Sequence, residues 1–143
     1  MDLALSLAER AAAAGEAPVG AVIVENGAVL AAEPNRMREL NDPTAHAELN
    51  AIRAALAARG TGRLDGCDLY VTLEPCAMCA GAIAHARIRR VVYGAGDPKA
   101  GAVEHGVRLF DSPNTHHRPE IVSGIGEQRA SELLKAFFAS LRA

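Results

Sequence analysis

The sequence predicts an α/β sandwich. Short apolar runs of strand length alternate with Ala- and Leu-rich stretches at helical spacing, and Gly and Pro stand where those stretches begin and end. Strands that alternate with helices are typical of this architecture. The chain has 143 residues, and we find no linker or internal repeat in its sequence. We therefore expect one domain, over residues 1–143, with a single core.

The first three elements follow from local signals. Residues 3–14 have leucines and alanines loosely at helical spacing, and Gly15 ends the expected helix. Two apolar runs, 19–24 and 28–32, are expected to be strands. An Asn-Gly pair stands between these runs and predicts a hairpin, because both residue types tolerate positive φ.

The middle of the chain continues the alternation. After a loop that contains two prolines, residues 44–59 show an Ala-rich helical pattern that Gly60 closes. Residues 68–73 are expected to form a buried strand. Pro75 then opens a helix that runs to about Ala86, since Pro is well tolerated in the first turn of a helix.

The last third of the chain is expected to hold two strands and a long helix. Residues 89–93 have valines at their centre and form the first of these strands. A Pro- and Gly-rich stretch follows to residue 119, mostly loop, with a short helix near Val103. A strand at 120–122 and a helix at 127–141 complete the chain.

Composition and cysteine count narrow the class of protein. The net charge is −2, so charge alone does not indicate nucleic-acid binding. No apolar run approaches the roughly 20 residues of a transmembrane helix. The residues after Met1 lack the basic region of a signal peptide, so we expect a cytoplasmic protein with no membrane partner. Three cysteines, an odd number, argue against a disulfide framework and leave metal binding or catalysis open.

Two short clusters carry the chemistry. His46 and Glu48 stand at the start of one expected helix, and Cys76 and Cys79 stand at the start of another. Cysteines three positions apart lie on one helix face, so both sulfurs can point at one place. Zinc accepts thiolate and imidazole ligands, and catalytic zinc sites keep one position open for water. We predict one Zn²⁺ with His46, Cys76 and Cys79 as ligands, and Glu48 as the catalytic base that takes a proton from the bound water.

This prediction has one geometric condition and one competitor. Residues two apart inside a helix point in nearly opposite directions, so His46 and Glu48 can share a site only near the helix's first turn. The competitor is a structural zinc site with Cys67 as fourth ligand. The strand after Cys67 would place its sulfur roughly 17 Å or more from Cys76. Two sulfurs on one zinc, each bonded at about 2.3 Å, must lie much closer than that, so we expect Cys67 to be a small buried apolar residue.

The two clusters match the zinc-deaminase pattern, His-x-Glu followed by Pro-Cys-x-x-Cys. Over nearly its whole length the chain resembles the tRNA adenosine deaminases of that superfamily, in segments 17–22, 41–48, 69–80 and 92–99. The run Gly-Ala-x-Asp-x-Lys-x-Gly-Ala, here residues 94–102, is more specific to the tRNA enzymes. The resemblance implies a cytidine deaminase-like fold, a three-layer α/β/α sandwich with a central five-stranded mixed sheet and helices on both faces, and zinc at two helix N-termini.

The resemblance also implies a substrate and its contacts. The reaction would be hydrolytic conversion of adenosine to inosine at the wobble position of an arginine tRNA anticodon stem-loop, in a homodimer with one Zn²⁺ per subunit. Asn35 and the backbone near Ala47 would hold the base. Asp97 and Lys99 would lie along the path of the flanking nucleotides. Phe138, on the last helix, would lie near the RNA while its neighbouring Phe packs inward.

Several of these residues have plainer explanations. Asn35 and Asp97 suit turns beside a proline. His117 and Arg118 resemble a family segment near the nucleic acid, but a solvated loop explains His117 equally well. The chain also departs from its relatives. Pro34 stands where they often carry Trp or Gly, and Ala139 stands where many carry a basic residue. These departures concern the docking of RNA and leave the metal site untouched.

Two other functions stay open at this point. One is the same zinc chemistry on a free nucleobase or nucleoside, such as guanine, cytosine or cytidine. The other is a non-catalytic, zinc-stabilised module. The run at 94–102 favours tRNA, and Glu48 argues against the module, because a structural zinc site has no use for a carboxylate beside its metal.

Overall fold

The computed structural model describes residues 1–142 and holds a single five-stranded sheet. The strands are β1 (Gly20–Glu25), β2 (Ala28–Pro34), β3 (Cys67–Leu73), β4 (Arg90–Ala95) and β5 (Glu120–Ser123). Their order across the sheet is β2-β1-β3-β4-β5. β1 is antiparallel to both of its neighbours, whereas β3, β4 and β5 are mutually parallel. The sheet is therefore mixed.

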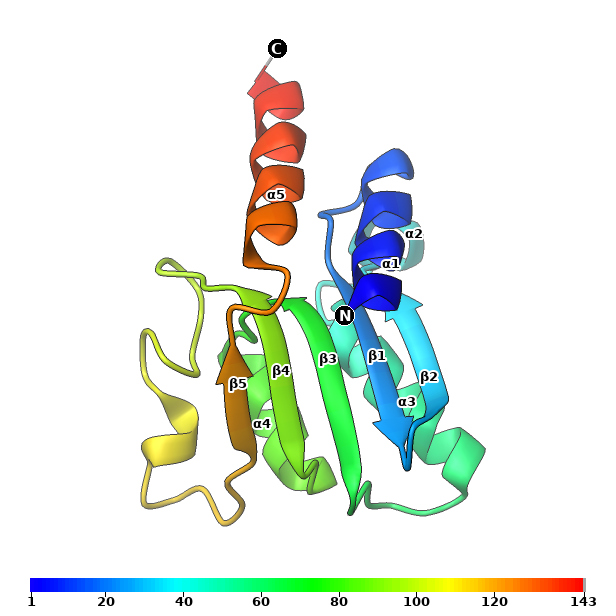
Figure 1. The fold of residues 1–143 in the computed structure, drawn as a ribbon, viewed down its shortest axis with the longest axis vertical. Coiled ribbons are helices and arrows are strands. Elements are labelled where there is room, and N and C mark those ends of the chain that lie inside the picture. The colour runs from blue at the N-terminus through cyan, green and yellow to red at the C-terminus, as the bar shows by residue number, and fades with distance from the viewer. Residues whose placement is uncertain (143) are drawn as a thin grey trace.

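Helices cover both faces of this sheet. They are α1 (Asp2–Ala13), α2 (Met37–Leu40), α3 (Ala47–Arg59), α4 (Ala77–Ala86) and α5 (Glu127–Arg142), with one 3₁₀ turn, η1 (Leu109–Asp111). Figure 1 shows α1 and α5 on one face and α3 and α4 on the other. The predicted three-layer sandwich is confirmed. Within residues 1–142 we find no helix with the length and apolar character that crossing a membrane requires.

The larger part of the core lies between the sheet and the layer formed by α3 and α4. Ile23, Leu69 and Val91 on the strands pack there against Ile83 of α4, and all four side chains are fully buried. Cys67 belongs to the same cluster and is fully buried, as predicted. Burial of apolar surface of this kind is the main favourable contribution to folding.

On the other face of the sheet, α5 packs against the strands only through the first turns of the helix. Ala130 is the buried residue of this helix, and it packs over Gly94 of β4, where an added Cβ would come within 3.2 Å of the Ala130 Cβ. The rest of α5 rises beyond the edge of the sheet at which β3 and β4 end (Figure 1). The C-terminal half of the helix is therefore free to contact something other than the core.

Apart from shifts of one or two residues at the ends of elements, the structure differs from the expectation in three places. α3 begins at Ala47 rather than at 44, because the Asp42 carboxylate accepts hydrogen bonds from the Thr44 backbone N–H at 2.8 Å and from its hydroxyl at 2.7 Å, which holds a turn. The loop expected after β2 contains the short helix α2. The helix expected near Val103 is wrong. The Val103 N–H donates to a Glu74 carboxylate oxygen at 3.0 Å, and a helical turn forms only at η1.

Candidate metal centre and active site

The three predicted ligands meet at the start of two helices. His46 is the N-cap residue of α3, Cys76 is the N-cap residue of α4, and Cys79 lies in the first turn of α4. The Cys76 and Cys79 sulfurs lie 3.7 Å and 3.5 Å from His46 Nδ1, and all three ligand atoms lie within 4.8 Å of one another. Two zinc bonds of about 2.0–2.3 Å at a tetrahedral angle place their ligand atoms about 3.5–3.8 Å apart, so the cluster fits one Zn²⁺.

Backbone geometry explains how His46 and Glu48 share this site. His46 has φ −66° and ψ 150°, which is extended, so the helix starts after it and Glu48 is the second helical residue. The condition set by the spacing of these two residues is thereby met. Cys76 has a similar extended form, with φ −74° and ψ 176°. Both helix N-termini favour negative charge, which suits thiolate ligands.

The two thiols share a proton. The hydrogen bond from Cys79 lowers the pKa of Cys76 to about 4, and the same bond raises the pKa of Cys79. The hydrogen bond with Cys76 also raises the pKa of His46. One sulfur is thus already a thiolate at neutral pH, and a cation at this position is favoured. This chemistry of the donor set agrees with the distances in assigning the cluster to zinc.

Glu48 is buried beside the cluster and is only 4% exposed. Burial raises the pKa of Glu48 to about 7, against the opposing effects of a backbone hydrogen bond and the nearby charge of His46. A carboxyl group whose pKa lies near neutral pH can both accept and return a proton. Glu48 therefore has the protonation behaviour that the predicted catalytic base requires.

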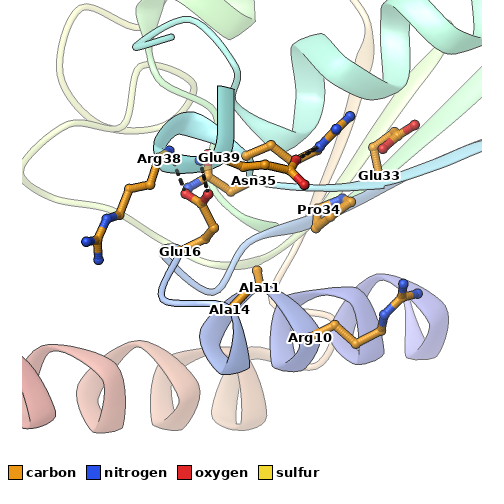
Figure 2. A pocket seen from close by; sticks show the side chains of 10 residues that line it. Arg10, Ala11, Ala14, Glu16, Glu33, Pro34, Asn35, Arg38 and Glu39 are labelled. Carbon is orange, nitrogen blue, oxygen red and sulfur yellow. Dashed lines mark hydrogen bonds and ion pairs between the residues drawn. The ribbon is translucent and has the colours of Figure 1, made fainter. Parts of the chain in front are cut away.

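A cavity of about 150 Å³ opens onto these residues, and its walls include Asn35, Met37, Glu48 and Asp97. A larger open groove of about 700 Å³ lies outside it, between the end of α1, the end of β2 and α2 (Figure 2). The groove and the cavity share Asn35. We place the chemistry in the smaller cavity, because Glu48 and two of the predicted ligands, His46 and Cys76, line that one.

Glu74 is a second buried carboxylate at this cavity, and the sequence analysis did not single it out. Its carboxylate accepts hydrogen bonds at 2.9–3.0 Å from the backbone N–H groups of Asp97, Val103, Glu104 and His105, and it lies 2.6 Å from His105 Nδ1. Burial alone would raise the pKa of Glu74, but these hydrogen bonds outweigh it and lower the pKa to about 2. Glu74 therefore stays charged and holds the loop that follows β4.

Close packing around Glu74 explains part of the run at 94–102. A Cβ added to Gly101 would lie 2.5 Å from the Glu74 carboxyl carbon and 2.5 Å from the Asp97 backbone oxygen, so a side chain has no room there. Gly101 also pairs with Cys76, one of the predicted ligands, in an isolated β-bridge. Two features of the sequence could have pointed to the role of Glu74. One is Gly101, and the other is the position of Glu74 two residues before Cys76.

The structure brings three of the five proposed substrate residues to the cavity. Asn35 and Ala47 are buried in its wall, and Asp97 is half-buried there. The Asp97 carboxylate accepts the backbone N–H groups of Lys99 and Ala100, both at 3.1 Å, so it also stabilises a turn. Lys99 itself is exposed, next to Ala100, which lines the cavity.

Phe138 lies on the protruding half of α5 and is 47% exposed. Its ring packs edge-to-face on Phe137, with centroids 5.5 Å apart, and Phe137 is half-buried. In the loop before β5, His117 Nε2 lies 2.6 Å from the Ile88 backbone oxygen, and Arg118 pairs with Asp111. These two contacts tie the loop to the segment before β4 and to η1.

An open zinc position beside a carboxyl group that can exchange a proton is what hydrolytic deamination of a base requires. Fold and site together define the class of protein as a zinc-dependent deaminase. Residues 1–95 match the family described as the cytidine and deoxycytidylate deaminase zinc-binding region.

Three relatives narrow the class further. The chain is 56% identical to the tRNA-specific adenosine deaminase of Agrobacterium fabrum, over 99% of this chain and 93% of that protein. A solved structure from a study of A-to-I editing by tRNA A34 deaminases is 57% identical, covers 94% of this chain and 97% of its own, and has a TM-score of 0.93. The guanine deaminase of Bacillus subtilis is 37% identical over 99% of this chain and 91% of its own, with a TM-score of 0.67. The chain belongs to the tRNA-specific adenosine deaminases, within the wider zinc-binding family.

Proposed function

We propose that this protein hydrolyses adenosine to inosine at the wobble position of tRNA, with an arginine tRNA anticodon loop as substrate. One observation carries the chemistry: Glu48 is buried on the same cavity as the His46, Cys76 and Cys79 cluster. The 56% identity to a tRNA-specific adenosine deaminase carries the substrate. Acting on tRNA, the enzyme would work in the cytoplasm.

The residues of the cavity have distinct roles in this reaction. Zinc held by His46, Cys76 and Cys79 supplies a Lewis acid that lowers the pKa of water to about 7. Glu48 takes a proton from the water whose oxygen adds to C6 of adenine, and delivers that proton to the ring nitrogen. Glu48 then carries the proton of the new C6 hydroxyl group to the amine; the bond between C6 and the amine nitrogen breaks, ammonia leaves and the C6 carbonyl of inosine forms. The burial of Glu48 keeps competing solvent away from this transfer.

The remaining site residues are proposed to hold the RNA. Asn35 and the Ala47 backbone would hold the base, which an anticodon loop already presents unpaired. Lys99, exposed beside the cavity, would contact a flanking phosphate, with Asp97 shaping the turn that carries it. Phe138 is proposed as a stacking surface, because its exposed ring stands on the half of α5 that extends past the sheet.

The role of Phe138 has a matched control on its own helix. Leu141 is a second apolar residue of α5 and is 60% exposed. Since base–aromatic stacking contributes about 1–3 kcal/mol, Phe138→Ala should raise KM for an anticodon stem-loop roughly tenfold with little change in kcat. Leu141→Ala should leave both constants near wild type. Equal effects of the two substitutions would remove Phe138 from the RNA-binding surface.

We also propose a homodimer, in which the partner subunit helps to shape the groove around the substrate. The proposal follows from membership of the family. Sedimentation of the zinc-loaded protein tests it, with a single species of twice the 14.9 kDa chain mass expected. A species of the mass of one chain at assay concentration would contradict it.

One comparison favours a second candidate. The guanine deaminase of Bacillus subtilis shares the fold at 37% identity, and guanine deamination would use the same zinc site and the same proton transfers. An ammonia-release assay separates the candidates. Zinc-loaded protein is given an arginine-tRNA anticodon stem-loop with A at the wobble position and, in parallel, free adenosine, guanine, cytosine and cytidine. Release from the stem-loop alone supports our proposal, and release from guanine alone supports the alternative.

A further inference from the structure

Glu16 is a buried carboxylate outside the reaction described above. It is 4% exposed and forms part of the wall of the larger groove (Figure 2). The end of α1 determines its position, because the Glu16 N–H donates to the Ala11 oxygen at 2.9 Å and the Gly15 N–H donates to the Ala12 oxygen at 3.0 Å. This pair of bonds is a Schellman ending, for which Gly15 has the required positive φ of 81°. The Glu16 side chain thus departs from a well-defined helix end.

The Glu16 carboxylate caps the short helix α2. One oxygen accepts the Arg38 N–H at 3.0 Å, and the other accepts the Glu39 N–H at 2.8 Å (Figure 2). Arg38 and Glu39 are the second and third residues of α2, the positions whose amides an N-cap side chain usually satisfies. A second link runs in the opposite direction, from Arg38 Nη1 to the Gly15 oxygen at 3.2 Å. Glu16 and Arg38 together dock α2 onto the end of α1.

α2 in turn carries one wall of the metal cavity. Asn35 and Met37 stand on either side of its N-cap residue, Arg36, and both line the cavity. The backbone on this side has two further anchors, from Asn35 N–H to the Val19 oxygen and from Arg36 N–H to the Ala45 oxygen, both at 3.0 Å. Met37 belongs to α2 and Asn35 lies two residues before it, so a displacement of α2 would move Met37 directly and would act on Asn35 through Arg36, at the place where the base is proposed to bind.

We propose that Glu16 is a positioning residue for the substrate, acting through α2 on Asn35 and Met37. The inference rests on the proposed function, in which Asn35 holds the base. Without the Glu16 carboxylate, the capped amides of α2 lose their acceptors, and only a fraction of the molecules keeps this wall in the arrangement that accepts the base. Apparent affinity falls by that fraction, while turnover of the bound substrate is retained. Loss of the Glu16 carboxylate should therefore raise KM and leave kcat nearly unchanged.

Steady-state kinetics on the anticodon stem-loop test this, with zinc-loaded Glu16→Ala, Glu16→Gln and a control, Glu39→Ala. The Glu39 side chain pairs with Arg36, so its removal leaves both capped amides in place. We expect Glu16→Ala to raise KM about tenfold, with kcat within about twofold and zinc content unchanged. Glu16→Gln keeps one acceptor oxygen and should fall between Glu16→Ala and wild type. Glu39→Ala should match wild type.

Two kinetic results would overturn the proposal: an unchanged KM in Glu16→Ala, or a fall in kcat that is larger than the rise in KM. If Glu16→Ala does not fold, Glu16→Gln carries the comparison. Hydrogen exchange at the Arg38 and Glu39 amides provides a readout that needs no substrate, and faster exchange there in the Glu16 variants, with α3 unchanged, is the expected result. Wild-type protein that leaves the stem-loop unmodified would refute the proposed function, whereas unaltered exchange in the variants would refute the role of Glu16.

Discussion

Glu48 and Glu74 are two buried carboxyl groups that line the same cavity, and their environments push their pKa values in opposite directions. Both side chains are nearly closed to solvent, with exposed fractions of 4% and 2%, but Glu48 lies deeper in the protein. Burial raises the pKa of Glu48 to about 7, whereas hydrogen bonds to Glu74 overcome burial and lower its pKa to about 2. The difference comes from the deeper burial of Glu48 and from the four backbone N–H donors and the imidazole that surround Glu74.

This difference separates a carboxyl group that moves protons from one that holds structure. A carboxylate with five donors gains nothing from protonation, so it stays charged and keeps its loop in place. A carboxyl group buried with few donors has its two protonation states close in free energy at neutral pH, which proton transfer requires. The depth of burial and the number of hydrogen-bond donors together decide which role a buried carboxyl group takes.

The largest expected effect comes from replacing Glu48, the group proposed to transfer protons. Glu48→Gln keeps the size of the side chain and removes its ability to accept a proton. We expect kcat on the anticodon stem-loop to fall about 10²- to 10⁴-fold, the usual contribution of a general acid–base, while one zinc per chain remains bound. Inosine formation and metal analysis measure the two quantities. Activity within a few-fold of wild type would assign the proton transfer to another group.

The next largest effect comes from replacing Glu74, the carboxylate that stays charged. Glu74→Gln keeps the shape, but it places an amide N–H₂ where the surrounding groups are donors. We expect the free energy of unfolding to fall by about 2–3 kcal/mol, since each hydrogen bond to a buried charged group contributes about 1.5–3 kcal/mol. Urea unfolding measures this. As a control, Glu120→Gln breaks an exposed pair with Arg90 and should cost less than about 1 kcal/mol. Equal losses in the two variants would deny Glu74 its structural role.

The pH dependence of the stability lost in Glu74→Gln tests whether the pKa of Glu74 is lowered. The pKa of Glu74 is about 2 in the fold against an ordinary 4.5, so its ionised form stabilises the native state. That stabilisation is complete above about pH 4.5 and disappears as pH falls from 4.5 towards 2. The stability difference between wild type and Glu74→Gln, both zinc-free, should be constant from about pH 5 to 7 and shrink below that range. A difference that persists undiminished at the lowest pH would contradict the lowered pKa.

The smallest effect concerns a single donor. His105→Ala removes the imidazole at 2.6 Å from Glu74 and leaves the four backbone donors in place. Because the imidazole is 43% exposed, we expect a loss of only about 0.5–1.5 kcal/mol in the free energy of unfolding. A loss as large as that of Glu74→Gln would mean that the imidazole, rather than the backbone, holds the carboxylate.

The metal centre could be predicted because its chemistry is encoded in short stretches. Cys76 and Cys79 share one helix turn, and only a few residue types bind zinc. The roles of Glu74 and Glu16 could not be predicted in this way. Their hydrogen-bond partners lie 22 or more positions along the chain and are mostly backbone N–H groups, which any residue type supplies, so for Glu74 the sequence offered only an indirect signal in Gly101. The start of α3 was misplaced for a related reason, since a local Asp42 turn competed with the helical pattern.

The most direct test of the central claim is the position of inosine in a treated anticodon stem-loop. Zinc-loaded wild-type protein is incubated with an arginine-tRNA stem-loop that carries A at the wobble position, and inosine is mapped by nuclease digestion and mass spectrometry. We predict inosine at the wobble position, with the other adenosines of the loop unchanged. A stem-loop recovered without inosine, from protein that converts free guanine to xanthine, would contradict the assignment.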